Sequence, residues 1–103
     1  MSKLTNYQKE VLKFYSKDYL IRKSEYKDFM STGVDFNFAK YVRLSEAVDV
    51  ARACINAVSL ALSIVQDIND DYVSFYDNSF LENELLRVNF SEVHNDNKKS
   101  IEH

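Results

Sequence analysis

The sequence predicts an all-α protein, a small helical bundle of about four helices around one long central helix. Two observations support this prediction. The 103 residues contain one glycine and no proline, too few for the many tight turns of an all-β fold. In addition, neither residue type occurs after Gly33, so nothing in the later chain is expected to kink or stop a helix.

Residues 45–71 are the predicted central helix. Their polar side chains recur at steps of three and four, which places them on one narrow stripe of a helix. The members of this polar stripe are Asp49, Arg52, Asn56, Ser59, Ser63, Gln66 and Asp70. Most other residues of the segment are apolar or small, and a helix of that kind needs neighbours on several sides.

The shorter helices are expected to cover the central one. Thr5 and Gln8 fit a capping box at the start of a helix over about residues 6–20. Ser24 is placed to cap a second short helix, which Gly33 would close in a left-handed conformation. A loop should then lead into helix at Phe38, where Asn37 is a good N-cap.

The C-terminal part of the chain predicts one further helix. Residues 70–78 read as a connection, and residues 79–82, Ser-Phe-Leu-Glu, match a second capping box. A helix of about ten residues containing Leu85, Leu86 and Val88 is expected to follow. Residues 1–93 are thus predicted to form a single domain. Residues 94–103 form a polar tail, predicted to be disordered because it has little apolar surface to offset its ordering entropy.

The predicted location is cytoplasmic. The first ten residues contain no apolar core of signal-peptide length. Charged residues interrupt the central segment too early for a membrane span, so no membrane partner is expected. The richness in Lys, Asn, Asp, Ile, Tyr and Phe would suit an AT-rich genome, such as that of a low-GC bacterium or its phage.

Charge is distributed unevenly along the chain. Residues 1–43 hold nine Lys or Arg and five Asp or Glu, whereas residues 44–103 hold four and eleven. Such asymmetry indicates either complementary faces within a dimer or separate surfaces for partners. The candidate basic patch is Lys9, Lys13 and Lys17. The candidate acidic patch is Asp67, Asp70, Asp71, Asp77, Glu82 and Glu84.

Few side chains are arranged for catalysis. There is no glycine-rich phosphate loop, and both histidines, His94 and His103, lie in the predicted tail. The single cysteine, Cys54, lies on an apolar line of the central helix and is interpreted as a buried structural thiol. We therefore expect no catalytic residue, metal or cofactor.

Carboxylates are the only candidates for metal chemistry. They gather at opposite ends of the central segment, roughly 30 Å apart along one helix, whereas Mg²⁺ needs converging oxygen ligands. These carboxylates are Glu46 and Asp49 at one end and Asp67, Asp70 and Asp71 at the other. A metal-dependent nucleotide hydrolase would need such a converging site. It is therefore ranked last, as the second alternative function.

The leading hypothesis is a non-catalytic regulator or inhibitor that binds another protein. A phage-encoded inhibitor of a host system is one version, in which the acidic surface occupies a partner's nucleic-acid channel. The first alternative is a nucleic-acid-binding regulator that uses the basic N-terminal helix. Acidic residues interleaved with the lysines, and the acidic net charge of −3, count against this alternative.

A homodimer through the central helix is also predicted, because the shorter helices can barely cover it and exposed apolar patches usually mark interfaces. Small residues at Ala53, Ala57 and Ala61 would permit close approach of a second helix. Alternatively, the same alanines admit bulky Tyr and Phe side chains of the N-terminal helices. The interface candidates are Arg52, Asn56, Ser59, Ser63 and Gln66 of the polar stripe, with Tyr19, Tyr26 and Phe36 as surface anchors.

Overall fold

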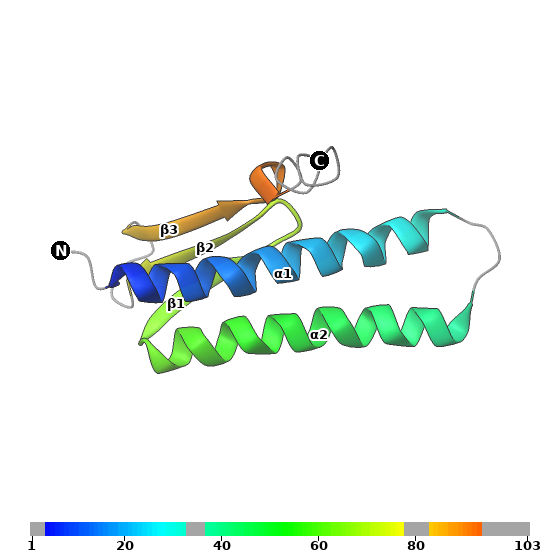
Figure 1. The fold of residues 1–103 in the computed structure, drawn as a ribbon, viewed down its shortest axis with the longest axis horizontal. Helices are drawn as coiled ribbons and strands as arrows, with labels where there is room; N and C mark the ends of the chain where they lie inside the picture. The colour runs from blue at the N-terminus through cyan, green and yellow to red at the C-terminus, as the bar shows by residue number, and fades with distance from the viewer. Residues whose placement is uncertain (1–3, 33–36, 78–82, 94–103) are drawn as a thin grey trace.

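The computed structural model describes residues 4–32, 37–77 and 83–93. Two long helices, α1 (Asn6–Ser31) and α2 (Phe38–Ala61), run antiparallel, and a three-stranded sheet covers one side of the pair (Figure 1). The strands are β1 (Ile64–Ile68), β2 (Tyr72–Asp77) and β3 (Glu84–Asn89). The prediction of an all-α bundle of four helices is therefore wrong, because the described residues form an α+β fold.

Helix α1 begins where the sequence predicts but is longer than expected. The capping box is confirmed: the Thr5 amide donates to Gln8 Oε1 at 2.9 Å, and the Gln8 amide donates to Thr5 Oγ1 at 3.1 Å. The helix then continues through Ser24 to Ser31, so the predicted break after residue 20 is wrong. No glycine or proline lies within it to interrupt the hydrogen bonds. Gly33 lies outside the described residues.

Helix α2 starts as predicted and ends about ten residues early. Asn37 caps it, since the Asn37 Oδ1 accepts from the Lys40 amide at 3.0 Å. The last residue of α2 is Ala61, and Ser63 follows in a left-handed conformation with φ of 57°. The Ser63 amide donates to the Leu60 carbonyl at 3.1 Å, which closes the helix end. A serine thus takes the stop position that usually belongs to glycine.

Residues 64–77, predicted as helix and connection, form an antiparallel hairpin instead. β1 and β2 pair so that Val65 faces Tyr76 and Ile68 faces Val73. Asn69 makes the turn between them, because its side-chain oxygen accepts from the amides of Asp71 at 2.9 Å and Tyr72 at 3.0 Å. The turn therefore needs neither glycine nor proline.

Strand β3 replaces the predicted last helix. It pairs antiparallel with β2, so that Val73 faces Val88 and Phe75 faces Leu86. The register shifts between Phe75 and Tyr76, where the ladder is irregular. The second predicted capping box, residues 79–82, lies outside the described residues, as does the predicted tail, residues 94–103.

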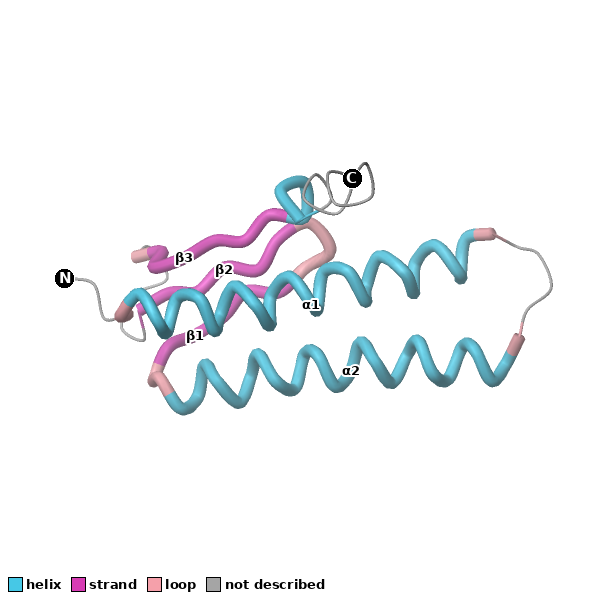
Figure 2. The backbone as a smooth tube through the Cα atoms, viewed as in Figure 1, coloured by secondary structure: helices cyan, strands magenta, loops and turns pink. Residues whose placement is uncertain are grey.

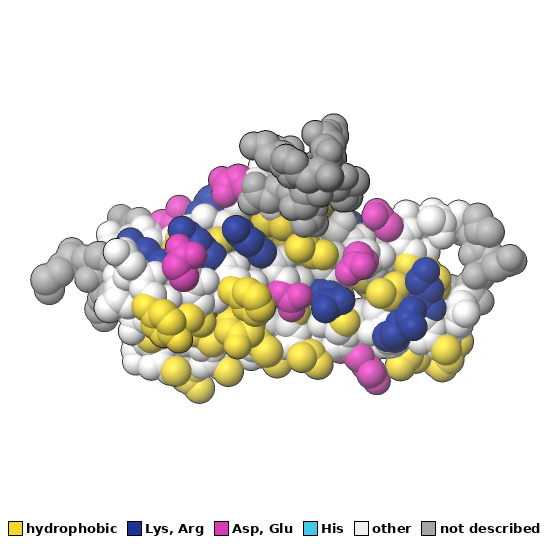
Figure 3. Space-filling view, in the orientation of Figure 1, with side chains coloured by type: hydrophobic (Ala, Val, Ile, Leu, Met, Phe, Trp, Pro, Cys, Tyr) yellow, Lys and Arg dark blue, Asp and Glu magenta, His cyan; other side chains and the backbone are white. Residues whose placement is uncertain are grey.

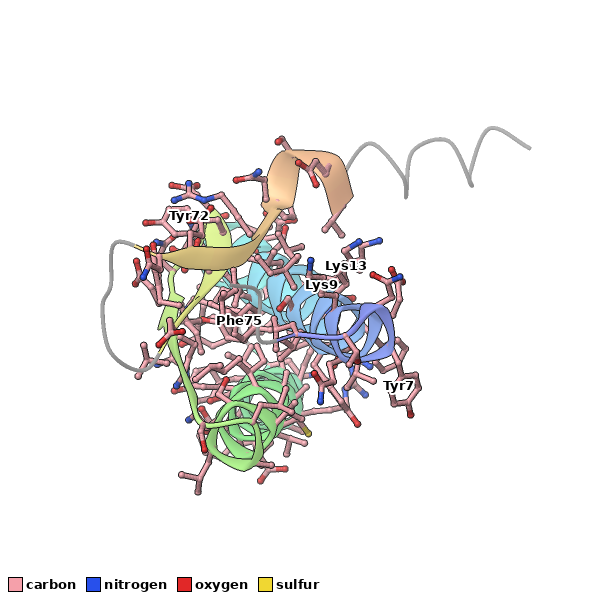
Figure 4. All side chains as sticks on the ribbon, turned by 90° about the vertical axis from the view of Figure 1, so that its left-hand side faces the viewer. Tyr7, Lys9, Lys13, Tyr72 and Phe75 are labelled. Carbon is pink, nitrogen blue, oxygen red and sulfur yellow. The ribbon has the colours of Figure 1, made fainter. Side chains whose placement is uncertain are left out.

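The core lies between the sheet and both helices. Phe75 and Val73 of β2 are fully buried there, together with Leu12 of α1 and Ile55 of α2. Figure 4 shows Phe75 in this interior. After β3, a single helical turn at residues 90–93 buries Val93 against the same core.

The sheet covers only part of the helical pair. Figure 2 shows the strands lying along the N-terminal part of α1 and the C-terminal part of α2, while the other end of the pair extends beyond the sheet. At that end an aromatic contact joins the two helices, since the ring centroids of Tyr26 in α1 and Tyr41 in α2 lie 6.1 Å apart. Within α2, the Phe38 ring lies 6.1 Å from that of Tyr41.

The effect of Ser63→Gly on the free energy of unfolding tests where α2 ends, because its sign depends on the backbone conformation of residue 63. Ser63→Gly should raise the free energy of unfolding by about 1 kcal/mol, because glycine adopts positive φ without the steric cost that serine incurs. In a continuous helix over residues 45–71, the same change would lower it by about 0.5 kcal/mol. Urea denaturation followed by circular dichroism measures the difference. Ala61→Gly, at the last helical residue of α2, is the control and should destabilise.

Candidate protein-interaction surface

The side of the sheet that faces away from the helices carries an ordered polar cluster. Because Val73 and Phe75 point into the core, the alternate side chains of β2 point the other way. Figure 4 shows Tyr72 on that side of the sheet, opposite the helices. We call this surface the outer sheet face and define it as Asp67, Tyr72, Ser74, Tyr76, Glu84 and Arg87.

Glu84 is the centre of this cluster. Its Oε2 accepts hydrogen bonds from Ser74 Oγ at 3.0 Å, Arg87 Nε at 3.0 Å and Tyr76 Oη at 3.4 Å. Ser74 is fully buried although it lies on the outer sheet face, so the Glu84 carboxylate supplies the acceptor that water cannot. The hydrogen bond with Glu84 also raises the pKa of Arg87 above its ordinary value.

Tyr72 contacts both Arg87 of β3 and Asp67 of the edge strand β1. The Arg87 guanidinium carbon lies 4.1 Å from the centroid of the Tyr72 ring, in a cation–π contact. The Tyr72 hydroxyl donates to Asp67 Oδ2 at 3.1 Å. Two tyrosines and one arginine are thus held by neighbours before any partner binds, which reduces the side-chain entropy that binding would cost.

The sheet and helix layers carry opposite net charge. Residues 64–77 and 83–93 hold six Asp or Glu and one Arg, a net charge of −5. The two helices hold nine Lys or Arg and six Asp or Glu, a net charge of +3. The chain's charge asymmetry therefore becomes a difference between two sides of the molecule.

The structure places most of the predicted acidic patch on the sheet layer. Asp67 and Glu84 lie in the outer sheet face, and Asp77 ends β2. Asp71 is exposed in the turn between β1 and β2. Asp70, in the same turn, accepts from Lys27 Nζ of α1 at 3.0 Å, and this hydrogen bond raises the pKa of Lys27. Glu82 lies outside the described residues.

The predicted basic patch lies on α1. Figure 4 shows Lys9 and Lys13 next to each other on one side of the helix. Lys13 Nζ lies 3.3 Å from Glu10 Oε1, so an acidic residue already pairs with one of the three lysines. Lys17 is exposed one turn further along α1.

Side chains of the predicted polar stripe form hydrogen bonds between α2 and the neighbouring elements. Arg52 Nη2 donates to the Tyr19 hydroxyl of α1 at 2.9 Å. Gln66 Nε2 of β1 donates to Asn56 Oδ1 at 2.6 Å. Ser59 is only 1% exposed, so the structure corrects its assignment as an interface residue.

The remaining interface candidate of the stripe, Ser63, is exposed after α2. Interface roles for it and for the exposed Arg52 and Asn56 stay predictions, as does that of Gln66.

The predicted aromatic anchors differ in position. Tyr19 is fully buried between the helices and the sheet, so it cannot anchor a partner, and that assignment is corrected. Tyr26 is partly exposed, with Lys23 Nζ 5.5 Å from its ring centroid. Desolvation, followed by the nearby Tyr41, raises the pKa of the Tyr26 phenol. Phe36 lies outside the described residues.

Four members of the outer sheet face were not predicted as site residues: Tyr72, Ser74, Tyr76 and Arg87. A signal for three of them is present in the sequence, since Tyr72, Ser74 and Tyr76 alternate with apolar Val73 and Phe75. Alternation of this kind is typical of a half-buried strand. Interpreting residues 70–78 as a connection concealed it.

Two properties of the described residues bear on other functions. No three His, Cys, Asp or Glu side chains there gather closely enough to hold a metal ion. Neither α1 nor α2 has an apolar stretch sufficient to cross a membrane.

Comparisons with protein-family models, with curated proteins and with solved structures find no match to this chain.

Removing the centre of the cluster should destabilise the fold through Ser74. Glu84→Ala leaves the buried Ser74 hydroxyl without its acceptor, which should lower the free energy of unfolding by about 1–2 kcal/mol. In a Ser74→Ala background the same change should cost clearly less, because that hydroxyl is gone. Thermal denaturation of the four proteins measures the coupling.

Glu92→Ala is the matched control for this cycle. Glu92 Oε1 accepts from Asn89 Nδ2 at 3.2 Å, and Glu92 is exposed. Its removal should change the free energy of unfolding by less than about 0.5 kcal/mol. Equal effects of Glu84→Ala in both backgrounds would refute the role of Glu84 in satisfying Ser74.

Proposed function

We propose that this protein is a non-catalytic regulator or inhibitor that binds a positively charged protein through the outer sheet face. The observation that supports the proposal best is the Glu84-centred cluster, which holds Tyr72, Tyr76 and Arg87 in place on one side of the sheet. Tyrosine and arginine are over-represented among the residues that dominate binding energy at protein interfaces.

The charge of the sheet layer indicates the kind of partner. Glu84 and Asp70 already have basic partners within the chain, whereas no Lys or Arg of the described residues forms an ion pair with the exposed carboxylates of Asp67 and Asp71. A negative surface speeds encounter with a basic one and disfavours acidic partners. A protein with a basic nucleic-acid-binding channel has the complementary chemistry. We place this interaction in the cytoplasm.

The size of the outer sheet face sets the expected strength of binding. Three strands of about six residues span on the order of 20 Å by 15 Å, or about 300 Å². A standard stable interface buries about 800 Å² on each partner. The outer sheet face would therefore form the centre of a contact that extends onto the neighbouring turn. We expect binding to weaken steeply as salt concentration rises.

A random-peptide display selection on the purified protein tests this proposal, because it identifies the preferred peptide chemistry even when the natural partner is unidentified. We expect the selected peptides to carry Lys and Arg next to apolar residues. Tyr72→Ala and Asp67→Lys should each weaken binding of a selected peptide at least about tenfold, as measured by fluorescence anisotropy.

Two variants serve as matched controls for the peptide titrations. Phe38→Ala removes an exposed aromatic ring from the far end of α2, and Asp28→Lys reverses an exposed charge near the end of α1. Both should bind within about threefold of the wild-type protein. Selected peptides without net positive charge, or equal losses in the controls, would contradict the proposal.

A parallel titration tests nucleic-acid binding. We expect no binding of labelled single- or double-stranded DNA and RNA at low salt. Salt-sensitive binding that disappears when Lys9, Lys13 and Lys17 are all changed to Glu would instead favour the nucleic-acid-binding function. Peptide binding by that triple variant should be retained, because the lysines lie on α1 and not on the sheet.

A further inference from the structure

A second surface lies on the side of the molecule opposite the outer sheet face. Along α2, Val50, Ala53, Ala57 and Leu60 are exposed and recur at intervals of three and four residues, so they form one stripe. On α1, Tyr7 and Phe14 lie two turns apart and are also exposed. We call these six residues the open helix face.

The side chains of the open helix face are unusually exposed for their type. The exposed fractions are 78% for Tyr7, 68% for Phe14, 62% for Val50 and 81% for Leu60. In Figure 3, hydrophobic side chains gather over the N-terminal half of α1 and the adjoining part of α2. Figure 4 shows Tyr7 pointing away from the sheet, on the opposite side from Tyr72.

The helical pair is therefore apolar on two sides, and the sheet covers only one of them. The covered side of α2 contains Val48, Ala51 and Ile55, which are in the core. A helix with apolar side chains around most of its circumference needs a further neighbour. A contiguous apolar surface of this kind on a folded protein marks an interaction site.

Charge along the open helix face suits a second copy of the same chain. A groove of about 360 Å³ between α1 and α2 is lined by Val50 and Cys54 together with two acidic and two basic side chains. The charged members are Asp18, Glu46, Arg22 and Arg43. Asp18 Oδ1 and Arg22 Nε already pair within the chain at 3.4 Å, whereas in a two-fold pair the Glu46 carboxylate of one copy can face Arg43 of the other. The sheet layer, at −5, would instead repel a second copy.

The dimensions of the open helix face predict a weak dimer. The stripe from Val50 to Leu60 is about 15 Å long, and two packed helices present a width of about 20 Å. The resulting area is on the order of 300 Å², below the roughly 800 Å² that each partner contributes to a standard interface, so the open helix face would be the apolar centre of a contact that extends onto the adjoining groove.

We propose that the open helix face binds a second copy of this chain, forming a two-fold symmetric dimer in which both outer sheet faces remain exposed. The proposal is independent of the proposed function, because it depends on the opposite side of the molecule. It assigns the predicted homodimer to the apolar stripe of α2 and not to its polar stripe.

Sedimentation equilibrium between about 1 µM and about 1 mM tests the dimer. The mass should rise from 12.1 kDa towards about twice that value. Phe14→Glu and Val50→Glu should each raise the dimer dissociation constant at least about 30-fold. Phe38→Glu is the matched control, since it adds the same charge at an exposed ring near the far end of α2, and it should stay within about threefold.

Alkylation of Cys54 gives a second readout that depends on the face used. Cys54 is the single cysteine, is partly exposed rather than buried as the sequence suggests, and lines the groove of the open helix face. Its rate of reaction with iodoacetamide should fall as the wild-type protein is concentrated. The rate should stay constant for Phe14→Glu. Circular dichroism establishes that each variant keeps its helix content.

Three results would overturn the proposal. They are a mass of 12.1 kDa at every concentration, a dimer that leaves Cys54 alkylation unchanged, and a loss of dimer in Phe38→Glu as large as in Phe14→Glu. A monomer that still binds basic peptides would disprove the dimer and leave the proposed function standing. A dimer that binds no basic peptide would disprove the proposed function and leave the dimer standing.

Discussion

The structure depends on the burial of α2, a helix that is apolar around most of its circumference. Val48, Ala51 and Ile55 on its inner side pack against α1 and the sheet. The sheet in turn is stable only because Val73 and Phe75 close over the helices, since a sheet this small needs a hydrophobic face packed on something. The sheet and α1 cannot cover α2 completely, and the apolar side chains that stay exposed on α2 form part of the open helix face.

Opposite sides of the molecule consequently differ in chemistry. The outer sheet face is acidic and contains tyrosine and arginine fixed by hydrogen bonds to Glu84. The open helix face is apolar, with charges that balance around its groove. These properties suit the two proposed occupants, a basic partner protein on one side and a second copy on the other. Because the surfaces do not overlap, neither proposed contact would block the other.

Local chemistry in the sequence predicted some elements correctly. Thr5 with Gln8 and Asn37 place two helix starts, because side-chain capping is decided by residues three apart. The absence of glycine and proline was a poor guide to where helices end. Ser63 reached positive φ, and the Asn69 side chain made a turn by bonding two backbone amides. Serine and asparagine are also tolerated inside helices, so neither residue by itself marks the end of a helix in the sequence.

The sequence by itself determined the helix caps, the all-round apolar character of α2 and the charge asymmetry, because each depends on residues near one another in the chain or on composition. Only the tertiary structure decided that residues 64–68 and 84–89 are strands. Short apolar runs fit helix and strand alike, and pairing with β2 selects between them. Tertiary packing also decided which neighbours the polar stripe contacts: Arg52 donates to Tyr19, and Asn56 accepts from Gln66. Partners this distant in sequence cannot be identified from local pattern.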